Sequence, residues 1–184
     1  MTNQNYEREI YIVVSQTGAI MSRILKGVTK DEYNHVSLSL DKGLGTMYSF
    51  GRLHAYNPWI GGFVMESPYW GTFKRFQETE AIVLSVPVTK EQYEELEEFL
   101  RQMYSEKRKY HYNYLGVMLA LFSIVYQQEN CYYCSEFVRD TLDRFAVVDA
   151  QCFEAIVKPQ DFLHVCGENV VFSGNLQNYA RQYA

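Results

Sequence analysis

The sequence predicts an α+β fold in which a mostly antiparallel sheet packs against helices. Two runs rich in Val and Ile, residues 10–14 and 81–88, indicate buried strands. Residues 35–41 alternate between apolar and polar side chains, which is typical of a strand with one buried face. An amphipathic helix at residues 89–107 opens with a capping box at residues 89–92. Strand periodicity and helix periodicity therefore occur in separate segments.

Weaker patterns complete the expected order of elements. The run of Met, Leu and Phe at residues 117–122 is interpreted as core. The further elements that we expect are a helix at 22–28, a polar turn at 29–32, a strand at 46–50 that pairs back with the strand at 35–41, a loop at 51–62 rich in Gly, Asn and aromatic residues, a short strand at 63–66, a buried helix at 116–127, a helix that begins near Cys134, and a strand at 168–173.

Length and charge limit the class of protein. A chain of 184 residues with 47% hydrophobic content and no Ser/Gly/Pro linker predicts a single domain over residues 1–184. The net charge of −5 argues against a nucleic-acid partner, which would need clustered positive charge. The basic cluster Lys107-Arg108-Lys109 is interpreted as the solvated end of a helix.

The N-terminal residues predict a cytoplasmic protein. They are polar and lack the apolar stretch of a signal peptide. The most apolar run, residues 117–126, is too short for a transmembrane helix, so none is expected. In a reducing compartment the four cysteines are not expected to form disulfides.

Cys134 is the strongest candidate for a nucleophile. It directly precedes an apolar stripe of helical period, formed by Phe137, Val138, Thr141, Leu142 and Phe145. A cysteine at the start of a helix meets unsatisfied backbone N–H groups and the positive end of the helix dipole. Both favour the thiolate, which is the reactive form. The N–H groups of Cys134 and Ser135 are then candidate donors to an oxyanion.

His35 is the best candidate for the matching base. It lies at the start of the strand at 35–41, on the polar face, where a rigid element would hold it. The three other histidines, His54, His111 and His164, lie in a loop or in irregular segments. Aromatic residues gather at 48–73, which indicates either a cleft for a sugar or peptide or simply core packing.

The cysteines also allow a zinc site or a redox pair. Cys131 and Cys134 form a C-x-x-C, and Cys152 and Cys166, with His164, could complete four zinc ligands. A structural zinc site usually has two closely spaced ligand pairs, whereas Cys152 stands alone. A redox C-x-x-C would be expected beside a βαβ pattern, and none surrounds it. We therefore predict no metal ion and no organic cofactor.

Seven segments occur in an order that resembles a known family. The chain is similar to the YiiX-like, circularly permuted branch of the NlpC-type papain-like cysteine hydrolases, and the likeness extends from about residue 10 to Tyr179. Its most specific parts are the His-Val strand and the Cys-Ser-Glu-Phe-Val helix start. The segments are residues 22–23, 33–37, 48–52, 61–64, 112–116, 133–138 and 159–162.

The resemblance implies a permuted papain-like fold with the nucleophile at a helix N-terminus. It implies Cys134 as nucleophile and His35 as base, with the histidine first in the chain, and amidase, peptidase or acyl-transfer chemistry. Relatives orient the histidine with a polar residue on the following strand, often a carboxylate. By position this third residue is Ser49, with Glu66 as the alternative outside that strand.

The same segments supply the expected substrate-binding residues, Tyr48, Arg52, Tyr133 and Ser135. The substrate class expected is a small molecule, a peptide or a lipid-like acyl compound, and the oligomeric state is left open. Two alternative functions remain at this point, a binding module that keeps the fold without catalysis and a zinc-stabilised interaction protein.

Overall fold

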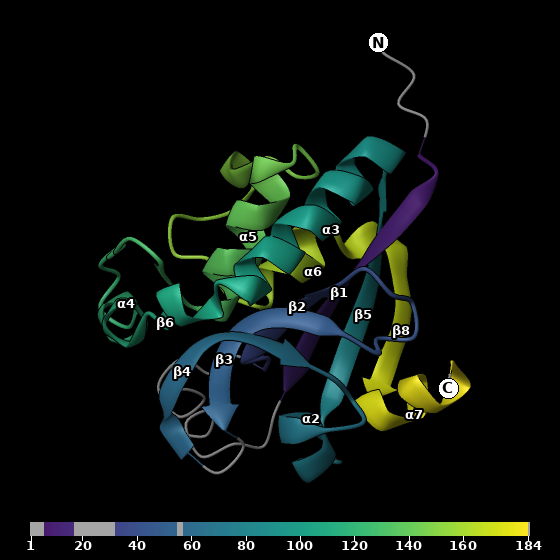
Figure 1. Cartoon of the computed structure of the whole chain (residues 1–184), viewed down its shortest axis with the longest axis horizontal. Coiled ribbons are helices and arrows are strands. Elements are labelled where there is room, and N and C mark those ends of the chain that lie inside the picture. The colour runs from purple at the N-terminus through teal and green to yellow at the C-terminus, as the bar shows by residue number, and fades with distance from the viewer. Residues whose placement is uncertain (1–5, 17–31, 55–56, 184) are drawn as a thin grey trace.

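A single eight-stranded sheet runs through the computed structural model, which describes residues 6–16, 32–54 and 57–183 (Figure 1). The strand order is β7-β6-β4-β3-β2-β1-β5-β8, and every neighbouring pair is antiparallel except β6 with β7. The strands are β1 (Arg8–Gln16), β2 (His35–Ser39), β3 (Met47–His54), β4 (Asn57–Glu66), β5 (Glu80–Val88), β6 (His111–Tyr112), β7 (Cys131–Tyr132) and β8 (Val170–Asn175). The predicted α+β class with a mostly antiparallel sheet is confirmed.

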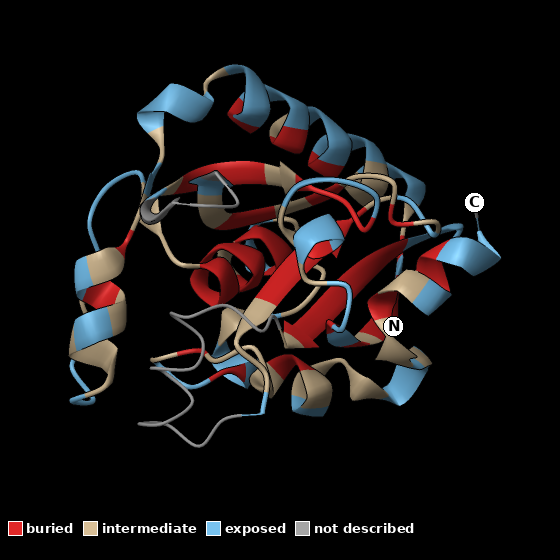
Figure 2. Ribbon diagram, turned by 90° about the horizontal axis from the view of Figure 1, so that it is seen from below, coloured by how far each residue is buried: buried red, intermediate tan, exposed pale blue. Residues whose placement is uncertain are grey.

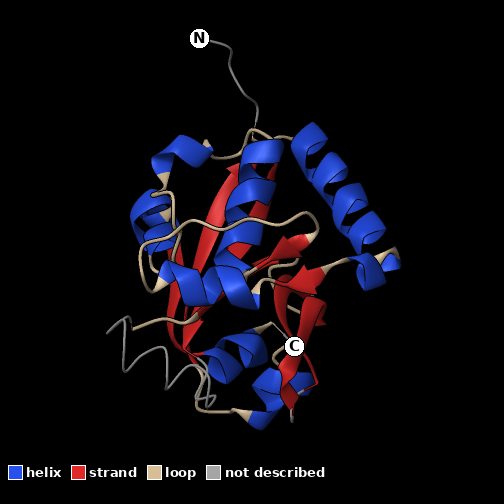
Figure 3. Ribbon diagram, turned by 90° about the vertical axis from the view of Figure 1, so that its left-hand side faces the viewer, coloured by secondary structure: helices blue, strands red, loops and turns tan. Residues whose placement is uncertain are grey.

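Helices cover both faces of this sheet. Figure 3 shows larger helices in front of the strands and short helices at their lower end. The described α-helices are α2 (Gly71–Arg75), α3 (Lys90–Ser105), α4 (Tyr114–Ala120), α5 (Cys134–Arg144), α6 (Asp161–Val165) and α7 (Leu176–Gln182). Short 3₁₀ turns occur at Lys107–Lys109, Ala150–Cys152 and Gly167–Asn169.

Strand β1 lies between β2 and β5, and helices pack on both of its faces. Its alternate residues Ile10, Ile12 and Val14 belong to the larger core cluster, with apolar side chains of α3, α5 and α6. The residues between them, Tyr11 and Val13, face the smaller cluster formed with α2 and α7. Figure 2 shows the buried positions concentrated in the central strands, with exposed positions on the outer sides of the helices.

Helix α3 begins as the sequence predicts. The side chain of Thr89 accepts a hydrogen bond from the N–H of Gln92 at 3.2 Å, and the Gln92 side chain accepts one from the N–H of Thr89 at 2.9 Å. This reciprocal pair satisfies two backbone donors at the helix start. The helix buries Leu96, Leu100 and Met103 against the sheet.

Two predicted elements are wrong. Residues 51–62 are not a loop, because β3 extends to His54 and β4 begins at Asn57. Residues 116–127 are not a buried helix, since α4 ends at Ala120 and Gly116 is its one buried residue. The run at 117–122 is half-buried or exposed and is not core. The helix predicted at 22–28 and most of the turn at 29–32 lie outside the described residues.

No helix within the described ranges combines the length and the apolar character needed to cross a bilayer.

Candidate functional site

Cys134 is the first residue of α5 and is buried, with 5% of its surface exposed. The helix can begin here because Tyr133 is extended and its N–H donates to the carboxylate of Glu136 at 3.4 Å. The first intrahelical bond runs from the N–H of Phe137 to the carbonyl of Tyr133 at 3.0 Å. The N–H groups of the first turn have no partner within the helix, so they can donate hydrogen bonds to a negatively charged group next to Cys134.

Ser135 fixes the start of α5 against a neighbouring loop. Its hydroxyl is buried and donates to the carbonyl of Val157 at 2.8 Å. The side chain therefore acts as a structural link, and the backbone N–H is the part of Ser135 that can meet a substrate.

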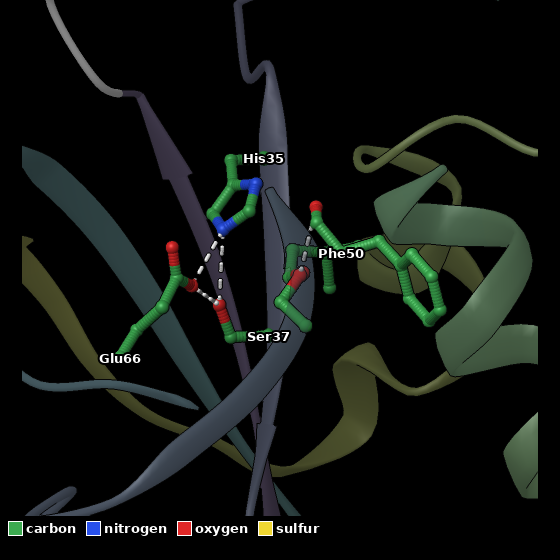
Figure 4. Close-up of polar contacts among 6 residues, drawn as sticks. His35, Ser37, Phe50 and Glu66 are labelled. Carbon is green, nitrogen blue, oxygen red and sulfur yellow. Dashed lines mark hydrogen bonds and ion pairs between the residues drawn. The ribbon is translucent and has the colours of Figure 1, made fainter. Parts of the chain in front are cut away.

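His35 is the first residue of β2 and lies opposite Ser15 of β1. Its Nε2 atom is 2.8 Å from Oε2 of Glu66, the last residue of β4. The hydroxyl of Ser37 donates to the same carboxylate oxygen at 2.9 Å, which leaves Ser37 3.3 Å from Nε2 (Figure 4). Figure 4 also shows Nδ1 on the edge of the ring turned away from Glu66, so that nitrogen is left for another partner.

Helix α5, which begins at Cys134, packs against β2, which begins at His35, and Cys134 is one of the groups that raise the pKa of His35. Burial lowers the pKa of His35, but the charge of Glu66, the hydrogen bond with Cys134 and the hydrogen bond with Glu66 together raise it to about 10. His35 is therefore an imidazolium over the whole neutral range, with Nε2 held by the Glu66 carboxylate.

The pKa shift of the Glu66 carboxyl group agrees with this arrangement. Burial raises the pKa of Glu66, but the positive charge of His35 and the hydrogen bonds from His35 and Ser37 outweigh it and hold the pKa below its usual value. Both groups are thus charged near neutral pH, and they form a buried ion pair.

A glycine of the intervening strand lies beside this pair. Glu66 and His35 are on β4 and β2, and β3 lies between them. A Cβ atom at Gly51 of β3 would lie 3.4 Å from Oε1 of Glu66 and 3.6 Å from Cε1 of His35. Since a larger side chain would fill this space, Gly51 leaves room for the carboxylate beside the ring.

A pocket of about 120 Å³ opens beside Cys134. Its walls combine apolar side chains from α4 and the loop after α5 with aromatic and polar groups. The lining residues are Tyr33, Asn34, Tyr112, Val117, Ala120, Leu121, Tyr133, Cys134, Ser135, Ile156, Val157, Lys158 and Pro159. An apolar pocket with a few polar groups beside a thiol suits an acyl group or a small hydrophobic side chain.

Two of the four predicted substrate-binding residues line the pocket beside Cys134, and the other two lie elsewhere. Tyr133 and Ser135 line the pocket beside Cys134. Tyr48 instead packs on the larger core, with its ring 6.1 Å from that of Phe63. Arg52 lines a second cavity, of about 300 Å³, on the Glu66 side.

The prediction that Ser49 orients the histidine is corrected by its hydrogen bonds. The buried Ser49 hydroxyl donates to the carbonyl of Val36 at 2.7 Å and approaches that of Phe50 at 3.5 Å. Glu66, the alternative from the sequence, is the residue on the imidazole. Sequence reasoning missed Ser37, although its place two residues after His35 on the same strand face was a usable signal.

The residues proposed as zinc ligands do not form a cluster. In the part of the chain that the structure describes, no three His, Cys, Asp or Glu side chains are grouped so that they could hold a metal ion. The four cysteines are free thiols.

Comparisons with protein-family models, with curated proteins and with solved structures found no match to this chain.

Proposed function

We propose that this chain is a cysteine hydrolase or acyltransferase with a permuted papain-like fold, in which Cys134, His35 and Glu66 act together. The observation that carries the proposal is the largely buried His35–Glu66 ion pair on a sheet against whose strand β2 helix α5, with Cys134 as its first residue, is packed. Each member is on a regular element, so packing holds the three groups in place.

The first half of the reaction forms a thioester. The Cys134 thiolate attacks the carbonyl carbon of an amide or ester, and the carbonyl electrons move to the oxygen. Backbone N–H groups of Cys134 and Ser135 stabilise this oxyanion. The tetrahedral adduct then collapses, the bond to the leaving group breaks, and the His35 imidazolium gives its proton to the leaving nitrogen or oxygen.

The second half releases the acyl group. His35, now neutral, takes a proton from water or from an acceptor alcohol or amine, and the resulting nucleophile attacks the thioester carbonyl. The carbon–sulfur bond breaks, the thiolate leaves, and His35 is again an imidazolium. Water gives hydrolysis, and another acceptor gives acyl transfer.

Glu66 is a positioning residue in this scheme. It holds Nε2 of the ring and so leaves Nδ1 for the proton transfer, and it stabilises the imidazolium that supplies the proton. Ser37 donates to the same carboxylate oxygen and so limits its movement. The acyl nature of the substrate and the cytoplasmic location stay predictions.

Alkylation of the cysteines tests the proposal. With iodoacetamide near neutral pH, followed by peptide mass spectrometry, we expect buried Cys134 to react faster than exposed Cys152. The reaction at Cys134 slows in His35→Ala, because the thiolate loses its cationic partner, whereas His164→Ala, which changes an exposed histidine, leaves the rate unchanged.

Two results would contradict the proposal. One is faster labelling of Cys152 than of Cys134 in the wild type. The other is an unchanged Cys134 rate in a folded His35→Ala variant. Either result would favour a binding module that uses the pocket without catalysis.

A further inference from the structure

Helix α4 has apolar side chains on all sides but is not buried. Every residue from Tyr114 to Phe122 is apolar, yet the fold buries only Gly116 within the helix. A helix that is apolar all round is normally enclosed by protein or lipid. Figure 1 shows α4 at the side of the molecule next to β6, and Figure 2 shows it apart from the buried centre.

The two sides of α4 have different surroundings. Val117, Ala120 and Leu121 line the pocket beside Cys134. Large side chains on the other positions of the helix and on the turn after it are open to water. We call this set the α4 patch: Leu115 (53% exposed), Met118 (57%), Phe122 (72%), Ile124 (50%) and Val125 (53%). A contiguous group of this size on a chain surface marks an interaction site.

A basic cluster adjoins the α4 patch. Lys107, Arg108 and Lys109 are exposed and form the turn that leads through β6 into α4. Five residue steps separate Lys109 from Tyr114, the first residue of α4, so their Cα atoms lie within about 18 Å of each other. Lys109 forms an ion pair with Glu106 at 2.7 Å, so Lys107 and Arg108 carry the excess positive charge of this cluster, and no acidic residue follows from 107 to 128.

Aromatic residues lie between the cations and the apolar side chains. Tyr110, Tyr112 and Tyr114 follow the basic cluster directly and are all partly buried. Tyr110 and Tyr112 pack against the larger core cluster and Tyr114 lies close to Gly61 of β4, so these tyrosines anchor the segment to the protein and leave the outer side chains of α4 in water.

We propose that the α4 patch and the basic cluster bind the surface of an anionic lipid bilayer. The apolar side chains enter the boundary between headgroups and acyl chains, and Lys107 and Arg108 face the lipid phosphates. The acidic remainder of the chain is repelled by the same surface, which orients the α4 patch toward the bilayer. A symmetric dimer through the patch would instead bring two copies of the basic cluster toward one interface, where like charges repel.

Flotation with lipid vesicles tests this surface. The full chain is expected to float with vesicles of phosphatidylcholine mixed with phosphatidylglycerol, and much less with vesicles of phosphatidylcholine alone. The double variant Met118→Asp/Phe122→Asp is expected to bind the mixed vesicles about a hundredfold more weakly. The reason is that it lacks two large apolar side chains that move from water into the bilayer when the wild type binds. The charge variant Lys107→Glu/Arg108→Glu is expected to lose the preference for anionic vesicles.

The matched control is Val170→Asp/Val171→Asp, which places the same two charges on exposed apolar positions of β8. It is expected to bind like the wild type, and circular dichroism checks that each variant is folded. Equal binding by wild type and Met118→Asp/Phe122→Asp, or no flotation of the wild type, would overturn the proposal. A wild-type dimer that this variant dissociates, measured by light scattering, would assign the patch to a second copy and also overturn it.

The proposal is independent of catalysis at the neighbouring pocket. Cys134→Ala is expected to bind vesicles as the wild type does. Absence of catalysis would therefore not contradict the proposed membrane surface, and absence of vesicle binding would not contradict the proposed cysteine chemistry.

Discussion

Replacing Glu66 with Gln removes the charge that faces His35 while keeping the length of the side chain. The wild-type carboxylate accepts hydrogen bonds from Nε2 of His35 at 2.8 Å and from Ser37 at 2.9 Å. A neutral amide can still accept one of these bonds, but it no longer stabilises an imidazolium. Burial then lowers the pKa of His35 without opposition from this carboxylate, and we expect that pKa to fall from about 10 toward or below 6.5.

The pKa of His35 sets the size of the effect. Its rise from 6.5 to about 10 corresponds to about 5 kcal/mol of net stabilisation of the imidazolium, to which Cys134 also contributes. Removal of one member of a buried ion pair commonly costs about 3 to 5 kcal/mol. We therefore expect E66Q to lower the free energy of unfolding by about 3 kcal/mol at pH 6.

The effect depends on pH in a defined direction. Because the pKa of His35 is raised on folding, its contribution is complete below about 6.5 and is lost as the pH rises toward about 10. Because the pKa of Glu66 is lowered, its contribution is complete above about 4.5 and is lost in acid. The difference between wild type and E66Q is therefore greatest between roughly pH 4.5 and 6.5, and it shrinks toward pH 10.

Two measurements check this expectation. Urea unfolding at several pH values gives the free energies, and the NMR shift of the His35 ring proton against pH gives its pKa. A wild-type His35 that titrates near 6.5, or an E66Q variant as stable as the wild type at pH 6, would refute the reasoning.

Three further changes have expected outcomes. Gly51→Val fills the space beside Glu66 and is expected to slow alkylation of Cys134 about a hundredfold, through misplacement of the histidine in a folded protein; an unchanged rate would contradict the role given to Gly51. Ser135→Ala removes the hydrogen bond to Val157 and is expected to cost about 1 to 2 kcal/mol in thermal or urea unfolding. Thr89→Ala removes the cap of α3 and is expected to cost about 1 kcal/mol in unfolding without a change in Cys134 reactivity.

The sequence predicted the fold where one local pattern decides the structure. The β-rich runs became β1 and β5, the capping box at Thr89 became the start of α3, and the stripe after Cys134 became α5. The sequence predicts a loop at 51–62, within the hairpin of β3 and β4, because Gly51, Gly61 and Gly62 suggest irregular backbone. In the folded chain these glycines are in the sheet, where Gly61 and Gly62 allow close approach of Tyr110, Tyr112 and Tyr114.

The prediction of a buried helix at 116–127 is wrong for a different reason. The apolar composition indicates burial but does not identify the groups that cover the helix. Within the described part of the chain, α4 buries only Gly116. The same limit applies to Glu66. Nothing in the local sequence around Glu66 relates it to His35, because the contact between the two side chains crosses the intervening strand β3. The contact passes beside Gly51, which has no side chain.

The most direct test of the proposed chemistry is the intact mass of the protein after incubation with an activated ester, such as a p-nitrophenyl acyl ester. The account predicts a covalent acyl adduct on the wild type, located at Cys134 by peptide mapping, absent from Cys134→Ala and slower to form in His35→Ala. Adducts that persist in Cys134→Ala at the wild-type rate, or that map to the exposed Cys152, would contradict it.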